Sequence, residues 1–124
     1  MKLEVGMYVR FNYHRVTVPI QISKIKEKHY EDIERYYYYL TDNGLVISEA
    51  QILKASHNVI DLIEVGDYVN GYKVSFKGND YQPFVQCDYP VQEGTTNHYR
   101  FYKEAIYSIL TKEAFKSMEY RLGG

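Results

Sequence analysis

The chain has 124 residues, of which 45% are hydrophobic and 25% are charged. This composition is typical of a folded globular protein and excludes a disordered chain, while the length allows one domain or two very small ones of roughly 55 to 60 residues. Lysine and arginine total 15 against 16 aspartates and glutamates. No overall charge would therefore attract a polyanion, which argues against a strongly basic nucleic-acid binder and against a DNA mimic.

The first element in chain order is one half of an internal repeat. Residues 3–9 (LEVGMYV) return as residues 63–69 (IEVGDYV), with five of the seven positions identical. A fainter similarity relates residues 46–53 to residues 101–108 and keeps the same order along the chain. A duplicated structural unit explains both similarities better than chance does.

Each repeat predicts a glycine turn followed by a strand. Because strand side chains alternate, the repeat's tyrosine, Tyr8 or Tyr68, points away from the face that carries its neighbours. The glycine suits a tight turn or bulge in which the backbone needs a positive φ. The residues expected on the shared face are Val5, Met7 and Val9 in the first repeat and Val65, Asp67 and Val69 in the second.

The rest of the first half also predicts strands, over residues 19–26, 35–41 and 45–47. The Asp42-Asn43-Gly44 sequence between the last two strands predicts a hairpin with a type I′ turn. The polar segment 29–35 is interpreted as a loop tip or a short helical turn with a solvated, charged face.

The second half repeats this plan after a short connection. Residues 55–62 are too apolar for a flexible linker and are expected to pack Val59, Ile60 and Leu62 between two units. A mobile polar loop is expected over residues 92–97, and Thr111 is expected to cap a short helix over residues 112–116. Strands are expected over residues 71–74, 84–87, 99–102, 106–110 and 119–122, with a turn over residues 77–80.

The aromatic residues are the unusual feature of the composition, with 15 tyrosines, five phenylalanines and no tryptophan. Tyrosine suits both half-buried strands and recognition surfaces. Residues 36–39 are all tyrosine, and alternation directs two of these rings to each side of the strand. One pair therefore lies outside the core of its own unit, where it either forms an interface with a partner or packs on the second unit or another copy.

Basic residues interleave with aromatic residues in the first half of the chain. Stacking rings beside side chains that neutralise phosphates is how small barrels hold single-stranded nucleic acid. A solvated strand edge protected by lysines explains the same residues. The residues concerned are Arg10, Arg15, Lys24, Lys26 and Lys28.

No combination of residues predicts catalysis, a metal site or a cofactor. Cys87 and His98 are a conceivable nucleophile and base, but Cys87 lies in an expected strand, where a cysteine is usually a small buried residue. Motifs that bind phosphates or catalytic zinc are absent from the sequence. The histidines lack the paired spacing of zinc sites; they are His14, His29, His57 and His98. We therefore expect a protein that is not an enzyme and needs no cofactor.

The expected compartment follows from the cysteine count and the hydrophobic pattern. A single cysteine excludes an internal disulfide and fits a reducing environment. The first residues hold no apolar run of signal-peptide length, and no stretch approaches the ~20 apolar residues of a membrane span. We expect a cytoplasmic protein without a membrane partner.

Two segments resemble a known group of proteins. Residues 58–74 (NVIDLIEVGDYVNGYKV) and residues 106–115 (IYSILTKEAF) look like segments of small proteins encoded by phages and prophages of Gram-positive bacteria. The resemblance covers the second half well and is weaker over residues 10–45, the part that varies among those proteins. The resemblance implies a shared scaffold with different recognition surfaces, and it implies no particular activity. Small phage proteins of this sort include accessory and anti-defence factors, among them inhibitors of bacterial immune systems.

Together these observations predict a mostly β protein with two tandem SH3-like barrels, at residues 1–54 and 63–124, a packed linker at residues 55–62 and a short C-terminal helical turn. We expect it to bind a host protein, such as a bacterial immune component of the CRISPR type, and to act by steric contact. Binding of nucleic acid through the basic residues, or of a nucleotide messenger in a tyrosine-lined pocket between protomers, are the alternatives. The expected partner-binding residues are Tyr13, His14, Arg15, Tyr30, Tyr36, Tyr37, Tyr38 and Tyr39.

Overall fold

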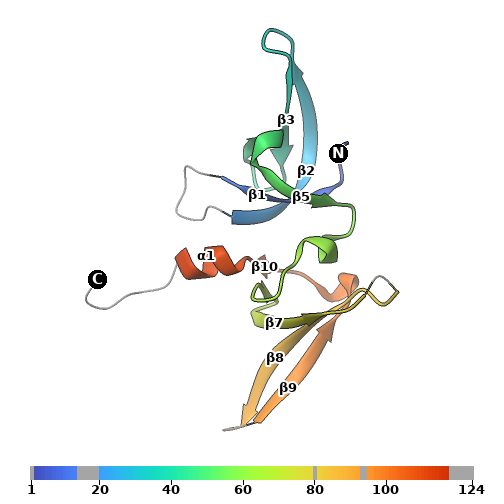
Figure 1. The fold of residues 1–124 in the computed structure, drawn as a ribbon, viewed down its shortest axis with the longest axis vertical. Coiled ribbons are helices and arrows are strands. Elements are labelled where there is room, and N and C mark those ends of the chain that lie inside the picture. The colour runs from blue at the N-terminus through green and yellow to red at the C-terminus, as the bar shows by residue number, and fades with distance from the viewer. Residues whose placement is uncertain (1, 14–19, 80, 93–94, 118–124) are drawn as a thin grey trace, which may run out of the picture. The chain divides into compact units, whose positions relative to one another are not determined.

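The structure is a computed structural model that describes residues 2–13, 20–79, 81–92 and 95–117. It is mostly β, with two five-stranded antiparallel sheets and one short α-helix among those residues (Figure 1). The chain divides into two compact units, Met1–Leu62 and Ile63–Gly124. Residues 55–62, expected as a linker, belong to the first unit, where they hold the end of its last strand and a 3₁₀ turn with Val59, Ile60 and Leu62 buried.

The first unit contains five strands in the spatial order β4-β3-β2-β1-β5. A 3₁₀ turn, η1 (Glu49–Gln51), separates the fourth strand from the fifth, and a second, η2 (Val59–Leu62), follows the fifth. The strands are β1 (Tyr8–Asn12), β2 (Ile20–Glu31), β3 (Tyr36–Thr41), β4 (Val46–Ser48) and β5 (Ile52–Ser56).

The second unit repeats this arrangement, with the order β10-β6-β7-β8-β9 and a 3₁₀ turn, η3 (Lys103–Ala105), between its fourth and fifth strands. In both sheets the first strand therefore lies between the second and the fifth. The strands are β6 (Tyr68–Val69), β7 (Tyr72–Lys77), β8 (Val85–Gln92), β9 (Thr95–Phe101) and β10 (Ile109–Leu110), and the helix is α1 (Lys112–Ser117).

Neither sheet is closed by strand pairing. Within the described residues, β4 and β5 form the two ends of the first sheet, and β9 and β10 form the two ends of the second. The expectation of closed barrels is therefore not met by the hydrogen-bonded strands. No helix in the described part of the chain is long and apolar enough to cross a membrane.

The sequence repeat forms the same turn in both units. Gly6 and Gly66 have φ values of 96° and 100°, so the expected positive φ is present in each. The Gly6 N–H donates to the carbonyl oxygen of Ile25 at 2.9 Å, and the Gly66 N–H donates to that of Val74 at the same distance. Ile25 and Val74 are therefore equivalent positions on the second strands.

The repeats also differ from the expected pattern at their first valine. Val5 and Val65 are exposed, although alternation placed them on the face shared with Val9 and Val69, which are buried. Both valines lie in the turn, before the strand begins at Tyr8 or Tyr68. Strand alternation does not apply there, and the expectation was wrong for this position.

The core of the first unit lies on one face of its sheet. Leu3 and Met7 pack there with side chains from four strands; these are Val9, Phe11, Ile25, Tyr39 and Ile47. The second unit buries Val69, Val74, Val85 and Cys87 in the same way. The side chains on the opposite, outer face of each sheet do not belong to this core.

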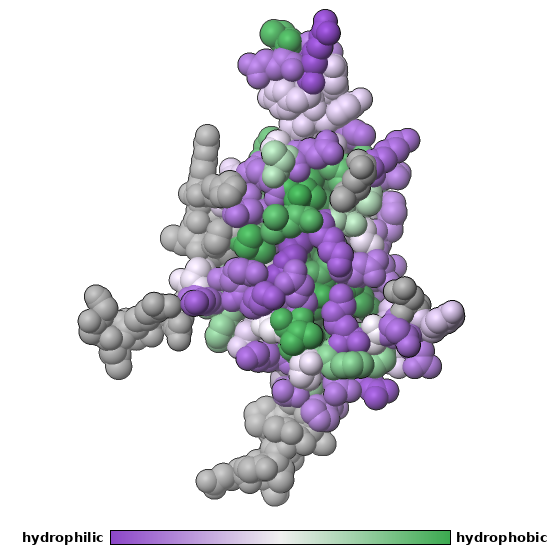
Figure 2. Space-filling model, in the orientation of Figure 1, coloured by the Kyte–Doolittle hydropathy of each residue, from purple (hydrophilic) through white to green (hydrophobic). Residues whose placement is uncertain are grey.

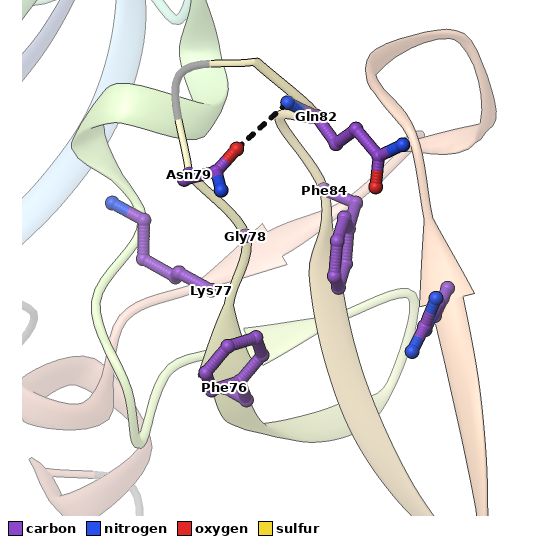
Figure 3. Close-up of a pocket in the computed structure, with 7 residues that line it drawn as sticks. Phe76, Lys77, Gly78, Asn79, Gln82 and Phe84 are labelled. Carbon is purple, nitrogen blue, oxygen red and sulfur yellow. Dashed lines mark hydrogen bonds between the residues drawn. The ribbon is translucent and has the colours of Figure 1, made fainter.

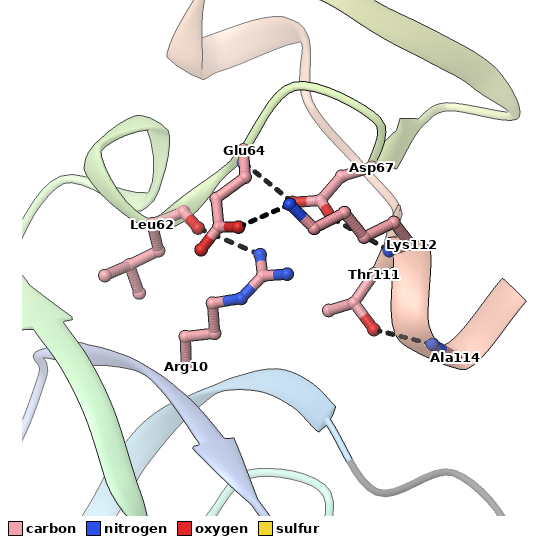
Figure 4. A network of polar contacts seen from close by, with 7 residues as sticks. All are labelled: Arg10, Leu62, Glu64, Asp67, Thr111, Lys112 and Ala114. Atoms are coloured by element: carbon pink, nitrogen blue, oxygen red, sulfur yellow. Dashed lines mark hydrogen bonds and ion pairs between the residues drawn. The ribbon is translucent and has the colours of Figure 1, made fainter. Parts of the chain in front are cut away.

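A buried carboxylate replaces an apolar core residue in the second repeat. Asp67 stands where the first unit has Met7, and its carboxylate accepts hydrogen bonds from the N–H of Glu64 at 2.7 Å and of Lys112 at 2.8 Å (Figure 4). A hydrogen bond of 2.8 Å from the Lys112 ammonium to the Glu64 carboxylate is the main cause that raises the pKa of Lys112. The repeated turn thus holds the start of α1. The Thr111 hydroxyl accepts from the Ala114 N–H at 3.1 Å, as expected for a helix cap.

Several turns differ from the predicted ones. In the β3–β4 hairpin only Gly44 has a positive φ, so the loop over residues 42–44 is of the three-residue kind and not a type I′ turn. The type I′ pattern occurs instead at Asn70 and Gly71, with φ values of 54° and 88°. The Asn70 side chain then binds the chain beyond η3, since it donates to the Ala105 carbonyl oxygen and accepts from the Tyr107 N–H.

The second sequence similarity was aligned one residue out of register. The turns η1 and η3 begin at Glu49 and Lys103, a spacing of 54 residues, whereas the similarity between residues 46–53 and 101–108 implied 55. Part of the expected polar loop over residues 92–97 forms the end of β8 and the start of β9, and β10 covers only the end of the expected strand 106–110. The expected strand over residues 119–122 lies outside the described residues.

We expect replacement of Asp67 by alanine to lower the free energy of unfolding by about 3 kcal/mol, because two partly buried backbone N–H groups lose their acceptor. The change is measured as the shift in the urea midpoint. Asp32→Ala is the matched control, since Asp32 is exposed in the β2–β3 turn and its loss is expected to change stability by less than about 0.5 kcal/mol. Equal midpoints for the two variants would contradict the assigned role of Asp67.

Candidate functional site

The most distinctive surface of the first unit is the β2–β3 hairpin, which extends beyond the other strands of its sheet (Figure 1). We call residues 29–38 the tyrosine hairpin. Its strands pair in register, with His29 opposite Tyr38, Tyr30 opposite Tyr37 and Glu31 opposite Tyr36. Since directly opposed residues share a face, Tyr36 and Tyr38 lie on one side and Tyr37 on the other. The predicted division of the tyrosines between two sides is confirmed.

The outer face of the hairpin carries a packed row of rings. The rings of His29 and Tyr38 stack with centroids 5.1 Å apart, and those of Tyr36 and Tyr38 lie 6.3 Å apart. The His29 Nε2 lies 3.1 Å from a carboxylate oxygen of Glu27, on the same strand face. These contacts fix the orientation of the row.

A shallow pocket of ≈ 420 Å³ adjoins this row. Tyr36 and Tyr38 line it on one side, and Val46 and Ser48 of β4 line it on the other. Val46 is an exposed hydrophobic side chain, and Gln51 of η1 lies at the border. The pocket therefore combines two phenol rings, two aliphatic residues, Val46 and Ile47, and polar groups that include the Glu31 carboxylate. The sequence analysis did not identify Val46 as a candidate site residue, because no local sequence pattern marks an exposed valine.

The other side of the hairpin is held by a lysine. Lys28 places its ammonium 4.6 Å from the centroid of the Tyr37 ring and donates to the Leu3 carbonyl oxygen at 2.9 Å. The ring of Tyr30 packs on that of Tyr37 with centroids 4.8 Å apart. Tyr30, Tyr36 and Tyr37 keep between 44 and 47% of their surface exposed.

The tip of the hairpin presents a hydrophobic side chain among charges. Ile33 is 88% exposed, and it lies in the turn with Asp32, Glu34 and Arg35. The Glu31 carboxylate accepts from the Glu34 N–H at 2.6 Å and thereby closes the turn. Figure 2 shows a hydrophobic group among hydrophilic atoms at the end of the hairpin. Sequence reasoning treated this segment as a solvated charge run and missed Ile33.

Tyr39 does not belong to this surface. It is 2% exposed and packs in the core with Val9, Phe11 and Ile47. Burial is the main cause that raises the pKa of its hydroxyl. Its prediction as a partner contact was wrong, because its side chain faces the core where side chains of β1 and β4 cover it.

The other predicted partner residues are not gathered at the hairpin. Tyr13 is partly buried and packs against the core cluster. His14 and Arg15 lie outside the described residues. The structure thus brings together Tyr30, Tyr36, Tyr37 and Tyr38 of the predicted set and adds Ile33 and Val46 to them.

The basic residues proposed for nucleic-acid binding do not form a common surface. Arg10 is 1% exposed and its guanidinium donates to the Leu62 carbonyl oxygen at 3.1 Å (Figure 4), so its prediction as a phosphate contact was wrong. Lys28 is engaged with Leu3 and Tyr37 as described above. Lys24 and Lys26 are exposed, with the Lys24 ammonium 5.5 Å from the Tyr8 ring centroid, and Arg15 lies outside the described residues.

The structure does not assemble Cys87 and His98 as a nucleophile and base. Cys87 pairs with Tyr99 and His98 with Asp88, so the two side chains point to opposite faces of the sheet. Cys87 is fully buried, and the Nδ1 atom of His98 lies 3.1 Å from the Asp88 carboxylate. Among the described residues, no three His, Cys, Asp or Glu side chains are placed to hold a metal ion.

Comparisons of the chain with protein-family models, curated proteins and solved structures find no match. The candidate site therefore rests on its own geometry.

We expect Tyr39→Ala and Tyr37→Ala to differ sharply in stability although they change neighbouring tyrosines. Removal of a buried ring costs about 3 to 5 kcal/mol, whereas the half-exposed Tyr37 contributes about 1 kcal/mol or less. Urea unfolding of the two variants measures the difference. Similar losses in both would contradict the separation of core and surface tyrosines.

We expect the Cys87 thiol to be unreactive in the folded protein. Burial raises its pKa from 9.0 to about 11, which lowers the thiolate fraction at pH 8 about a hundredfold, and the thiolate is the nucleophile. The protonated thiol stabilises the fold fully below pH 9, and this contribution is lost as the pH rises toward 11. Reaction with a chromogenic disulfide at pH 8, with and without denaturant, measures the effect, and equal rates would contradict it.

Proposed function

We propose that this chain is a non-enzymatic binding protein that recognises another protein through the tyrosine hairpin. The observation that carries the proposal is the set of tyrosine rings that lies outside the core yet is held in place by ring contacts on both sides of the hairpin. Tyrosines at the surface that are fixed before contact supply a large contact area at low entropy cost.

The composition of the outer face supports a protein as the ligand. Tyr36, Tyr38 and Val46 offer apolar contact area. The polar part of the lining consists of the Glu31 carboxylate and of Ser48 and Gln51, which are hydrogen-bonded to each other. Protein interfaces combine an aromatic centre with a polar rim in this way. Ile33 at the tip adds an anchor that a pocket of the partner can bury.

The charge of the tip favours a basic rim on the partner. Glu31, Asp32 and Glu34 carry three negative charges around Ile33, against the single positive charge of Arg35. A complementary positive surface would accelerate the encounter and fix the orientation of the complex.

We further propose that both units are SH3-like. The support is the strand order, in which the first strand lies between the second and the fifth, with a 3₁₀ turn before the fifth strand in each unit. This is the order of strands in SH3-like folds, whose surfaces serve many unrelated binding functions.

The partner proposed is a host protein, in particular a component of bacterial immunity, and the mechanism is occupation of its surface. This assignment rests on the resemblance of residues 58–74 and 106–115 to phage and prophage proteins. Nucleic-acid binding by the first unit is less favoured, because Arg10 is buried and Lys28 is engaged within its unit.

We expect a variant with Tyr36→Ala and Tyr38→Ala to lose capture of the partner by at least about tenfold, because both rings line the pocket on the outer face. The tagged chain is used to recover proteins from a Gram-positive host lysate, and each candidate is then purified and titrated against the wild type and the variant.

The control variant is Tyr107→Ala, which removes an equally large exposed tyrosine in the second unit. The melting temperature of each variant is measured alongside, and capture is compared at a temperature at which all variants are folded. Capture that survives the double substitution, or that is lost with Tyr107 as well, would refute the assignment to the tyrosine hairpin.

A further inference from the structure

A second pocket lies in the second unit, at the end of β7, and has different chemistry from the first. Its volume is ≈ 430 Å³, within the range of small-ligand sites. Phe76 and Phe84 line it, with Arg100 from β9 and the amide side chains of Asn79 and Gln82 from the loop that follows β7 (Figure 3). Nothing in the proposed contact with a partner protein uses these residues.

Strand pairing places the main side chains in one row on the outer face. Phe76 of β7 is opposite Gln86 of β8, and Gln86 is opposite Arg100 of β9. The neighbouring residues Val85 and Cys87 point into the core. Phe76 is 53% exposed on this face, which is unusual for a phenylalanine in a strand.

The arginine lies over a phenylalanine ring. The guanidinium carbon of Arg100 is 4.8 Å from the Phe84 centroid, and its Nε donates to the Gln86 side-chain oxygen at 3.4 Å. The rings of Phe76 and Phe84 are 6.1 Å apart and tilted by 45°. The pocket thus contains two kinds of planar surface, an exposed ring and a guanidinium.

The loop after β7 is shaped around the Phe84 ring. A Cβ on Gly78 would lie 2.6 Å from that ring and 2.3 Å from the Gln82 carbonyl oxygen, so only glycine allows this approach. The Asn79 side-chain oxygen accepts from the N–H groups of Tyr81 and Gln82, both at 3.0 Å. These contacts hold the Asn79 side chain in the loop, and the neighbouring Gln82 also lines the pocket. Lys77 lines the pocket as well, although its side chain extends away from Phe84 (Figure 3).

We propose that this pocket binds a nucleobase together with its phosphate. A flat heterocycle stacks on phenylalanine and guanidinium surfaces, and its edge pairs with amide groups. A simple anion would leave the exposed Phe76 ring unused, and a purely aliphatic ligand would leave the arginine and the amides unpaired. The planar base uses all of them.

The same chemistry comes from two sources, a free nucleotide or one nucleotide of a single strand. Arg100 and Lys77 both line the pocket. The contact therefore neutralises one or two phosphates, so the logarithm of affinity is expected to fall with the logarithm of salt with a slope between about −0.7 and −1.4. A strongly basic groove would give a much steeper slope.

The test is a titration of the full chain, followed by amide NMR, with four probes: adenosine, adenosine monophosphate, inorganic phosphate and a short oligothymidylate. We expect adenosine and its monophosphate to shift the signals of Gly78, Asn79 and Phe84, and phosphate alone to leave them unchanged. Tighter binding of the oligothymidylate identifies a single strand as the source, and tighter binding of the monophosphate identifies a free nucleotide. Either result supports the nucleobase site.

Phe76→Ala is expected to weaken binding of the monophosphate by about tenfold, through the loss of a stacking surface. Arg100→Lys keeps the charge and removes the planar group, so it is expected to weaken binding as well, and it provides a second test on an exposed residue. Tyr81→Ala is the control, because Tyr81 is 95% exposed in the same loop and does not line the pocket. Equal shifts with phosphate alone, no binding of any nucleobase probe, or unchanged affinity in folded Phe76→Ala or Arg100→Lys would overturn the proposal.

Discussion

The arrangement of both sheets depends on the hydrogen bond that a glycine with positive φ donates to the second strand of its unit. Gly6 and Gly66 each make this bond at 2.9 Å. The residue after each glycine accepts a second bond from the same strand residue. The Ile25 N–H donates to the Met7 carbonyl oxygen at 2.8 Å, and the Val74 N–H donates to the Asp67 carbonyl oxygen at 2.7 Å. The pair of bonds fixes the register of the first two strands. A shift of one residue would exchange the core face and the outer face. The pairing irregularity between Ile25 and Glu27 lies between this point and the hairpin, so the turn and the irregularity together set the side on which each ring lies.

The exposure of the tyrosines follows from the length of β2. This strand has 12 residues, but β1 pairs only with residues 20–24 of it, and β4 reaches β3 no further than Tyr38. Among the described residues no strand lies beside the part of the hairpin beyond these partners, so its side chains stabilise one another across the two strands. The stacked rings of His29 and Tyr38 and the packed rings of Tyr30 and Tyr37 supply that stabilisation. The same pairs that hold the hairpin together are the ones proposed to meet a partner.

Local patterns in the sequence were enough to predict the duplicated turn, most strands, the Thr111 cap and the alternation of the four tyrosines. They were not enough to separate Tyr37 from Tyr39, because both lie on one side of β3 and differ only in whether neighbouring strands cover them. Arg10 was mistaken for a surface cation for a related reason, since its acceptor, the Leu62 carbonyl, is 52 residues away. Phe76 and Arg100 were not predicted as site residues, because strand pairing, and not their spacing in the sequence, brings them to one face. Contacts between distant segments decide each of these cases.

The two candidate sites occupy corresponding positions in the duplicated units. The irregularity in strand pairing falls between Ile25 and Glu27 in the first unit and between Val74 and Phe76 in the second, so Phe76 corresponds to Glu27. Glu27 pairs with Leu40, which pairs with Val46. Phe76 likewise pairs with Gln86, which pairs with Arg100. Arg100 therefore corresponds to Val46. The shared turn and core keep the outer face in place, and substitutions on that face do not disturb the buried residues that define the fold. One unit therefore presents tyrosine and valine there, and the other presents phenylalanine and arginine, so that a single scaffold carries two different surface chemistries.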